Sequence, residues 1–313
     1  MKEYIERFAS KKFGIYNHFL FGQPGAPAYG DMSREEETRE WKRRTEAFDP
    51  EMIAYELNKI GAGYYFITLM QGFRFMLAPN STFDRLCGFV PGEACSERDI
   101  VAEFIPALDK YGIDLCLYFT GDGPYRDIGC NSSMGCIHEN GKINPWFIQN
   151  WASVLEEYAV RYGDKIKAWW IDGCYDEKIW KGAGYTDELL SPYYDAVKKG
   201  NPNALVAVNN GVKSELYKWY SKSELTSGEQ TSFTHLPPSK NVDGALSHFL
   251  IPFGSGEACG GWCQRGARIS RELLRRYISH VNEIGGVVTV DIFIDDEGRL
   301  DGEQLELLAD LMK

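Results

Sequence analysis

Short apolar runs alternate with amphipathic segments along the chain, and this alternation limits the fold more than any other feature. Near-continuous hydrophobicity over a few residues is typical of strands that are buried on both faces of a parallel sheet. The amphipathic segments between them are typical of helices that cover such a sheet. We expect eight strands, at residues 13–19, 63–69, 114–120, 167–172, 204–208, 225–230, 244–253 and 287–292.

The alternation predicts an α/β fold of the single (β/α)8 TIM-barrel type. The length of 313 residues suits one such barrel. No composition shift of the kind that marks a linker divides the chain. A doubly wound open sheet is the alternative, but no Gly-x-Gly-x-x-Gly pattern follows the first strand.

Two helix starts and two long loops carry local signals. Ser33 and Glu36 have the spacing of a capping box, and Asp49-Pro50 combines an N-cap with a proline at the first helical position. The segments 70–97 and 254–266 are read as long loops at the rim of the barrel. Further helices are expected at 97–111, 144–162, 187–199, 268–283 and 302–312.

Composition excludes some partners. The formal net charge of −11 argues against a nucleic-acid surface, which normally carries a basic patch. No apolar run is long enough to span a bilayer, and the charged N-terminus lacks the apolar core of a signal peptide, so we expect a cytoplasmic protein with no membrane contact. The eight cysteines show no CxxC spacing, which favours scattered buried thiols over a metal site.

The run from Lys167 to Gly173 ends abruptly in Asp172, where the fourth expected strand leaves the sheet. Chemistry in such barrels is placed at this carboxyl edge of the strands. An aspartate that merely starts a turn with Gly173 is the alternative. Asp172 is therefore the first candidate for a catalytic carboxylate.

Glu229 falls at the sixth expected strand, so it would project toward the same end of the barrel. Glycosidases need two carboxyl groups that flank the scissile bond, one ionised and one protonated. A solvated loop glutamate is the alternative for Glu229, and Glu257 in the second rim loop is the rival acid. Asp122 and Asp291, near other strand ends, are further carboxylates, and their number alone does not choose the pair.

Four aromatic or polar residues stand near the ends of other expected strands, which indicates a pocket lining although each could be a core residue. They are His18, Tyr118, Trp170 and His248.

The order of several short motifs resembles the α-L-fucosidases of glycoside hydrolase family 29. Phe13-Gly14-Ile15-Tyr16-Asn17-His18 is similar to the family's first-strand motif, and Trp170-Ile171-Asp172-Gly173 to its W-x-D-G nucleophile motif. Similar segments at residues 48–65, 110–118 and 285–304 follow in the family's order.

The resemblance implies a retaining exo-glycosidase that acts on an oligosaccharide or glycoside and needs no cofactor or metal. It implies Asp172 as the nucleophile and Glu229 as the acid/base, with His18, Tyr118 and Trp170 as sugar contacts. It covers the catalytic barrel, residues 1–313, without the C-terminal β-sandwich. The sequence sets no oligomeric state.

One departure from the family lies after the second strand. The family has a His pair there that grips sugar hydroxyls, whereas this chain has Met70 and Gln71. Gln71 is therefore the candidate substrate contact at this position. Because a site built for a hydroxyl discriminates strongly, two alternatives stay open: a glycosidase with changed sugar specificity, and a barrel that binds sugar without hydrolysing it.

Overall fold

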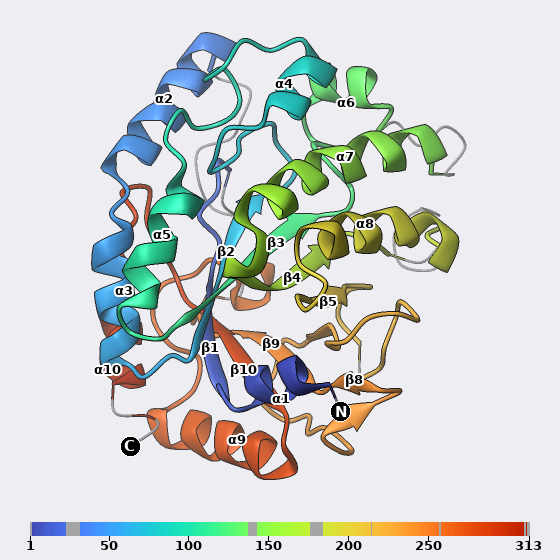
Figure 1. The fold of residues 1–313 in the computed structure, drawn as a ribbon. Coiled ribbons are helices and arrows are strands. Elements are labelled where there is room, and N and C mark those ends of the chain that lie inside the picture. Colours follow the sequence, from blue (N-terminus) through green and yellow to red (C-terminus); the bar gives the residue numbers. More distant parts are fainter. Residues whose placement is uncertain are drawn as a thin grey trace.

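The computed structural model describes residues 2–22, 32–136, 143–175, 184–213, 215–256, 258–309 and 311. Its centre is a curled sheet of eight parallel strands in the order β5-β4-β3-β2-β1-β10-β9-β6 (Figure 1). The strands are β1 (Phe13–Asn17), β2 (Tyr64–Met70), β3 (Asp114–Thr120), β4 (Ile166–Asp172), β5 (Leu205–Val208), β6 (Gly228–Glu229), β9 (His248–Pro252) and β10 (Val287–Asp291). The α/β architecture is as predicted, but the sheet forms an open half-barrel, since no ladder joins β5 to β6 among the described residues.

The strands are apolar because they are covered on both sides. Their outward side chains share one large cluster with the helices, while their inward side chains form a second cluster that includes Tyr64, Phe66 and Trp170. Helix α1 (Glu3–Ala9) adds Ile5 and Phe8 to this inner cluster. The ring of Phe8 lies 4.7 Å from that of Tyr64. Helix α1 therefore fills the amino-terminal end of the barrel interior.

The predicted helix starts are confirmed. Ser33 caps α2 (Arg34–Ala47) with both hydrogen bonds of a capping box, and Asp49 caps α3 (Pro50–Lys59). The covering helices continue around the sheet (Figure 1). They are α5 (Ile100–Asp109), α7 (Pro145–Tyr162), α8 (Asp187–Gly200), α9 (Arg271–Ile284) and α10 (Gly302–Leu308).

Three expectations need correction. The segment 70–97 is not only loop, because it contains α4 (Ser81–Cys87) and buries Phe83 completely. The single strand expected at 244–253 is divided into β8 (Ala245–Leu246) and β9, and β8 forms a small hairpin with β7 (Asn241–Val242). Two helices, α1 and α6 (Ile128–Met134), were not expected.

The gap between β5 and β6 is bridged near its amino-terminal end. The backbone N–H of Glu224 donates to Val206 O at 3.1 Å, and Oε2 of Glu224 accepts from Val206 N at 3.3 Å. Oε1 of Glu224 pairs with Lys198 Nζ at 2.6 Å. This buried carboxylate therefore holds β5 and α8 to the segment that leads into β6.

In the part of the chain that the structure describes, no helix combines the length and apolarity that a membrane crossing requires. The cysteines at 87, 95, 116, 130, 136, 174 and 263 are free, and all but Cys87 are buried, as the sequence predicts for scattered thiols.

Candidate active site

A cavity of about 200 Å³ opens at the carboxyl ends of the strands. Residues from seven of the eight strands, or from the loops that follow them, reach it. Its lining is Tyr16, His18, Leu20, Gly22, Gln71, Tyr118, Arg126, Trp170, Asp172, Tyr175, Asn209, Glu229, Leu250, Trp262 and Cys263.

Asp172 is the last residue of β4, and both of its carboxylate oxygens accept hydrogen bonds. Tyr118, on the neighbouring strand β3, donates its hydroxyl to Oδ2. Asn209, which follows β5, donates from Nδ2 to Oδ1 at 2.6 Å. Asn209 itself is held beside β4 by the bond from its backbone N to Ile171 O, 2.7 Å long. These donors fix the carboxylate in one orientation at the edge of the cavity.

Glu229 ends β6 and faces Asp172 across the gap in the sheet. The same Nδ2 of Asn209 lies 2.5 Å from Glu229 Oε2. The amide orientation is fixed, because Asn209 Oδ1 accepts from Gly211 N at 3.1 Å and Nδ2 must then point to the carboxyl groups. One amide nitrogen thus connects two acidic side chains that lie on opposite sides of the gap.

The two carboxyl groups have different surroundings. Burial and the nearby charge of Asp172 raise the pKa of Glu229 to about 7, although the hydrogen bond from Asn209 and the charge of His18 oppose the shift. A carboxyl with this pKa keeps its proton through mildly acidic pH and can act as a general acid. Asp172 differs from Glu229 in that each of its two carboxylate oxygens accepts a hydrogen bond from a side chain.

His18, after β1, is oriented by a second buried carboxylate. Its Nδ1 lies 2.8 Å from Oδ1 of Asp291, the last residue of β10. Burial disfavours a charged ring, but Cys263 and Asp291 outweigh it, so the pKa of His18 lies well above its usual value. The ring meets that of Tyr16 edge-on at 4.3 Å and that of Trp262 at 5.7 Å. The β1 side of the cavity is therefore an aromatic wall that contains one imidazole held by a buried carboxylate.

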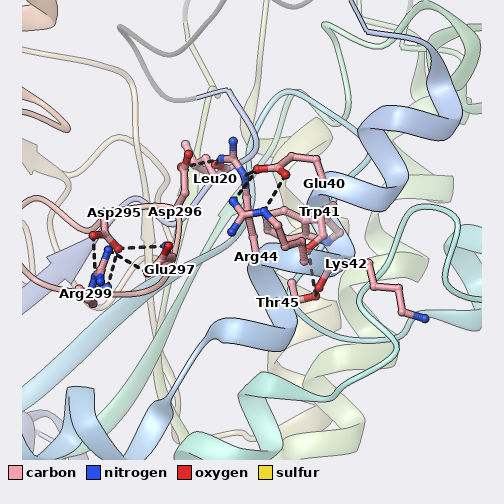
Figure 2. A network of polar contacts seen from close by, with 11 residues as sticks. Leu20, Glu40, Trp41, Lys42, Arg44, Thr45, Asp295, Asp296, Glu297 and Arg299 are labelled. Carbon is pink, nitrogen blue, oxygen red and sulfur yellow. Dashed lines mark hydrogen bonds and ion pairs between the residues drawn. The ribbon is translucent and has the colours of Figure 1, made fainter.

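The loop after β1 is tied to the helical layer by Arg44 of α2, as Figure 2 shows. The guanidinium of Arg44 donates to the backbone oxygen of Leu20 at 3.3 Å and pairs with Glu40 at 2.9 Å and Asp296 at 2.7 Å. Because Leu20 lines the cavity, this buried arginine positions part of the cavity wall.

The structure brings most of the sequence candidates together. Six of the sequence candidates line this same cavity, near the ends of five strands or in the loops that follow: His18, Gln71, Tyr118, Trp170, Asp172 and Glu229. Glu257, the rival acid, lies outside the described residues.

The expected place of His248 is wrong. His248 is the first residue of β9, not the last, and it is fully buried at the other end of the strand. Its Nε2 lies 2.7 Å from Thr289 Oγ1, and burial lowers its pKa to about 3. It is a neutral core histidine and does not line the cavity.

Asp122 lies behind the nucleophile candidate rather than in the cavity lining. Burial and the charge of Asp172 raise its pKa to about 8, against a hydrogen bond from Tyr185. Gly173 has φ +73°, and a Cβ there would lie 2.7 Å from Asp122 Oδ2. Only glycine therefore fits directly after Asp172.

Nine lining residues were not among the sequence candidates, and four of these carry polar or aromatic side chains from outside the strands: Arg126, Tyr175, Asn209 and Trp262. Asn209 follows a strand directly, and that position alone could have identified it. The other three lie in loops whose course no local pattern sets. Within the described ranges, no group of three or more His, Cys, Asp or Glu side chains is arranged to hold a metal ion.

Several solved structures of α-L-fucosidases share this fold. A family 29 enzyme from Bacteroides thetaiotaomicron is 17% identical with a TM-score of 0.68, and the match covers 99% of this chain and 73% of that one. AlfC from Lactobacillus casei, solved with its α-L-fucose product, is 17% identical with a TM-score of 0.68, over 99% of this chain and 98% of that one.

A third structure, 16% identical with a TM-score of 0.67 over 99% and 74% of the chains, is a covalent intermediate of a Bacteroides thetaiotaomicron family 29 fucosidase trapped with 2-fluoro-fucosyl fluoride. No protein-family model and no curated protein sequence matches the chain. At these identities, the likeness shows that the fold is shared.

Proposed function

We propose that the chain is a retaining glycoside hydrolase of the α-L-fucosidase type, in which residues 1–313 form one (β/α)8 catalytic unit. Asp172 is the nucleophile and Glu229 the acid/base. The substrate is a glycoside with a terminal sugar of α-L-fucose or related configuration. The solved enzymes that share the fold act on fucosides, and one of them forms a covalent intermediate.

The observation that carries this proposal is the pair of contacts made by Asn209. Because one nitrogen contacts Asp172 Oδ1 and Glu229 Oε2, the two oxygens lie no more than about 5 Å apart. Carboxyl groups of retaining glycosidases are separated by ~5–5.5 Å, whereas those of inverting enzymes lie ~6.5–9.5 Å apart to admit a water molecule. The short separation favours direct attack by Asp172 on the sugar.

The reaction takes two steps. The Asp172 carboxylate attacks the anomeric carbon while Glu229 donates its proton to the glycosidic oxygen, and the leaving group departs as an alcohol. Glu229, now ionised, then removes a proton from water, which attacks the anomeric carbon and releases Asp172. Since Glu229 Oε2 accepts from Asn209, the transferred proton is assigned to Oε1.

The sugar contacts follow from the walls of the cavity. His18, held by Asp291, presents a ring nitrogen as a donor, and the faces of Trp170 and Tyr16 suit the apolar side of a sugar ring. Gln71 stands at the position of the family's His pair and offers an amide in place of imidazoles. An amide both donates and accepts, so it can still bind a hydroxyl.

The test is turnover of a panel of nitrophenyl glycosides that includes the α-L-fucoside, with the purified wild type and the variants Asp172→Asn and Glu229→Gln. Proton NMR of the released sugar should show retention of the anomeric configuration. A 2-fluoro glycosyl fluoride of the accepted sugar should add one glycosyl mass to the peptide that contains Asp172. Asp109→Asn, on an exposed helix surface, is the matched control.

Two results would overturn the proposal. Inversion of configuration would remove Asp172 as a nucleophile, and full activity of Asp172→Asn would remove it from the mechanism. Thermal shifts with free monosaccharides, measured on the same samples, separate the remaining alternative. Binding without turnover of any glycoside would mark the chain as a sugar-binding barrel.

A further inference from the structure

We propose that Arg126 is an anion-recognition site at the mouth of the cavity, and that the natural substrate is a glycoside bearing a carboxylate or sulfate group. This inference rests on the proposed function and specifies its substrate class. Arg126 lines the same cavity as Asp172 and Glu229, although it belongs to the loop after β3 and is itself exposed.

The position of Arg126 is built by its neighbours. Its backbone N donates to Gly72 O at 2.8 Å, which joins the loop after β3 to the loop after β2. Gly72 has φ +76°, and a Cβ there would lie 3.2 Å from Arg126 Cδ. The glycine therefore leaves room for the arginine stem to lie flat against the rim.

Two aromatic rings orient the guanidinium. Nε of Arg126 donates to the hydroxyl of Tyr125 at 3.0 Å, and the guanidinium lies 5.3 Å from the Tyr125 ring centre and 5.9 Å from that of Phe73. Such contacts hold the cation without neutralising it. Among the described residues Arg126 makes no ion pair, so its terminal nitrogens can serve a ligand.

Charge decides what that ligand is. The inner part of the cavity carries Asp172, the proposed nucleophile, whose carboxylate would repel an anion placed beside it. A guanidinium at the mouth offers two parallel N–H groups, the geometry that matches carboxylate, sulfate or phosphate. We therefore expect an oxyanion that reaches the mouth while the reacting carbon lies between Asp172 and Glu229.

The anion could belong to the leaving group or to the sugar itself, and two experimental arms distinguish these sources. In the first arm, kcat/KM is measured for aryl glycosides whose leaving groups differ only in a carboxylate or a carboxamide. In the second, the same sugar with and without a sulfate ester competes against a neutral aryl glycoside. Each preference for the anion is measured in wild type, Arg126→Gln and Arg126→Lys.

Within each arm, the readout is the preference of the wild type for the anionic compound divided by the same preference of Arg126→Gln. This ratio cancels the intrinsic reactivity of each leaving group. We expect about a tenfold ratio in one arm, an intermediate value for Arg126→Lys and a smaller ratio at high salt, as a charge-assisted contact requires. Arg275→Gln, with the same change of net charge on the exposed side of α9, should give a ratio of one.

If wild type and Arg126→Gln show the same preference in both arms, a ratio of one, the anion site is overturned. The proposed function does not depend on this result, because it is tested by the hydrolysis of neutral glycosides. If no glycoside is cleaved, the proposed function fails, and thermal shifts with the sulfated and unsulfated sugars still test Arg126. Equal shifts for the two sugars would then overturn the anion site, and a larger shift for the sulfated sugar that is lost in Arg126→Gln would support it.

Discussion

Asn209 Nδ2 lies 2.5 Å from Glu229 Oε2 and thereby joins β5 to β6, two strands with no ladder between them in the described part of the chain. The same amide holds Asp172. One side chain thus contacts both proposed catalytic groups across the gap. The first three predictions follow from this arrangement, and the fourth tests the other contact across the gap.

Replacing Asn209 with alanine should lower kcat/KM by about 10- to 100-fold, because both carboxyl groups lose a charge-assisted hydrogen bond. The hydrogen bond from Asn209 lowers the pKa of Glu229, so its removal should also move the alkaline limb of the pH profile upward. Asn210→Ala, whose amide donates to Tyr217 instead, is the control. An unshifted alkaline limb in Asn209→Ala would contradict the assigned contact.

The pH profile of the wild type should fall above about pH 7. The raised pKa of Glu229, about 7, keeps the required proton in place at lower pH, and the proton is lost as the pH rises through that value. Values of kcat/KM, obtained from initial rates between pH 5 and about 9, define this alkaline limb. In Glu229→Gln the alkaline limb should disappear. Its persistence in that variant would assign it to another group.

Tyr118→Phe should reduce kcat by roughly tenfold or more, since it removes the hydroxyl that donates to Asp172 Oδ2 and leaves the ring in place. Tyr277→Phe is a matched control. The Tyr277 hydroxyl is also buried but has no hydrogen-bond partner among the described residues. Single-turnover kinetics of both variants separate the glycosylation step from product release. Equal rates for Tyr118→Phe and wild type would show that the contact does not support the reaction.

Glu224→Ala should lower the free energy of unfolding by roughly 3–5 kcal/mol, because it leaves the half-buried Lys198 cation without its partner. Urea unfolding measures the change. The adjacent pair Lys199–Glu156 is exposed, so Glu156→Ala should cost less than about 1 kcal/mol. Similar losses in the two variants would mean that Glu224 does not hold the segments across the gap.

Much of the fold could be predicted because its signals are local. The capping box of Ser33 and the Asp49-Pro50 start are sequence patterns with one structural solution. The strand at 114–120 has the predicted bounds, since an apolar run flanked by polar residues has few other uses. The short helix α6 was missed because its sequence, rich in Gly, Asn and Ser, has low helix propensity.

The candidate site could be predicted only where a residue lies at or near the carboxyl end of a strand. Asp172 and Glu229 reach the cavity because the period of the sheet places them there. His248 was misplaced, because the strand expected at 244–253 is interrupted at Ser247 and His248 begins a new strand. Arg126 depends on a hydrogen bond to Gly72, 54 positions earlier, and no local pattern encodes such a contact.

Helix α1 has a consequence for how any ligand moves. Ile5 and Phe8 occupy the interior at the amino-terminal end of the strands, so among the described residues the cavity is closed at that end. A polymer cannot thread through it, and only the tip of a branch or chain can reach the bottom. In the proposed reaction, the released sugar would therefore not leave through the amino-terminal end of the barrel interior.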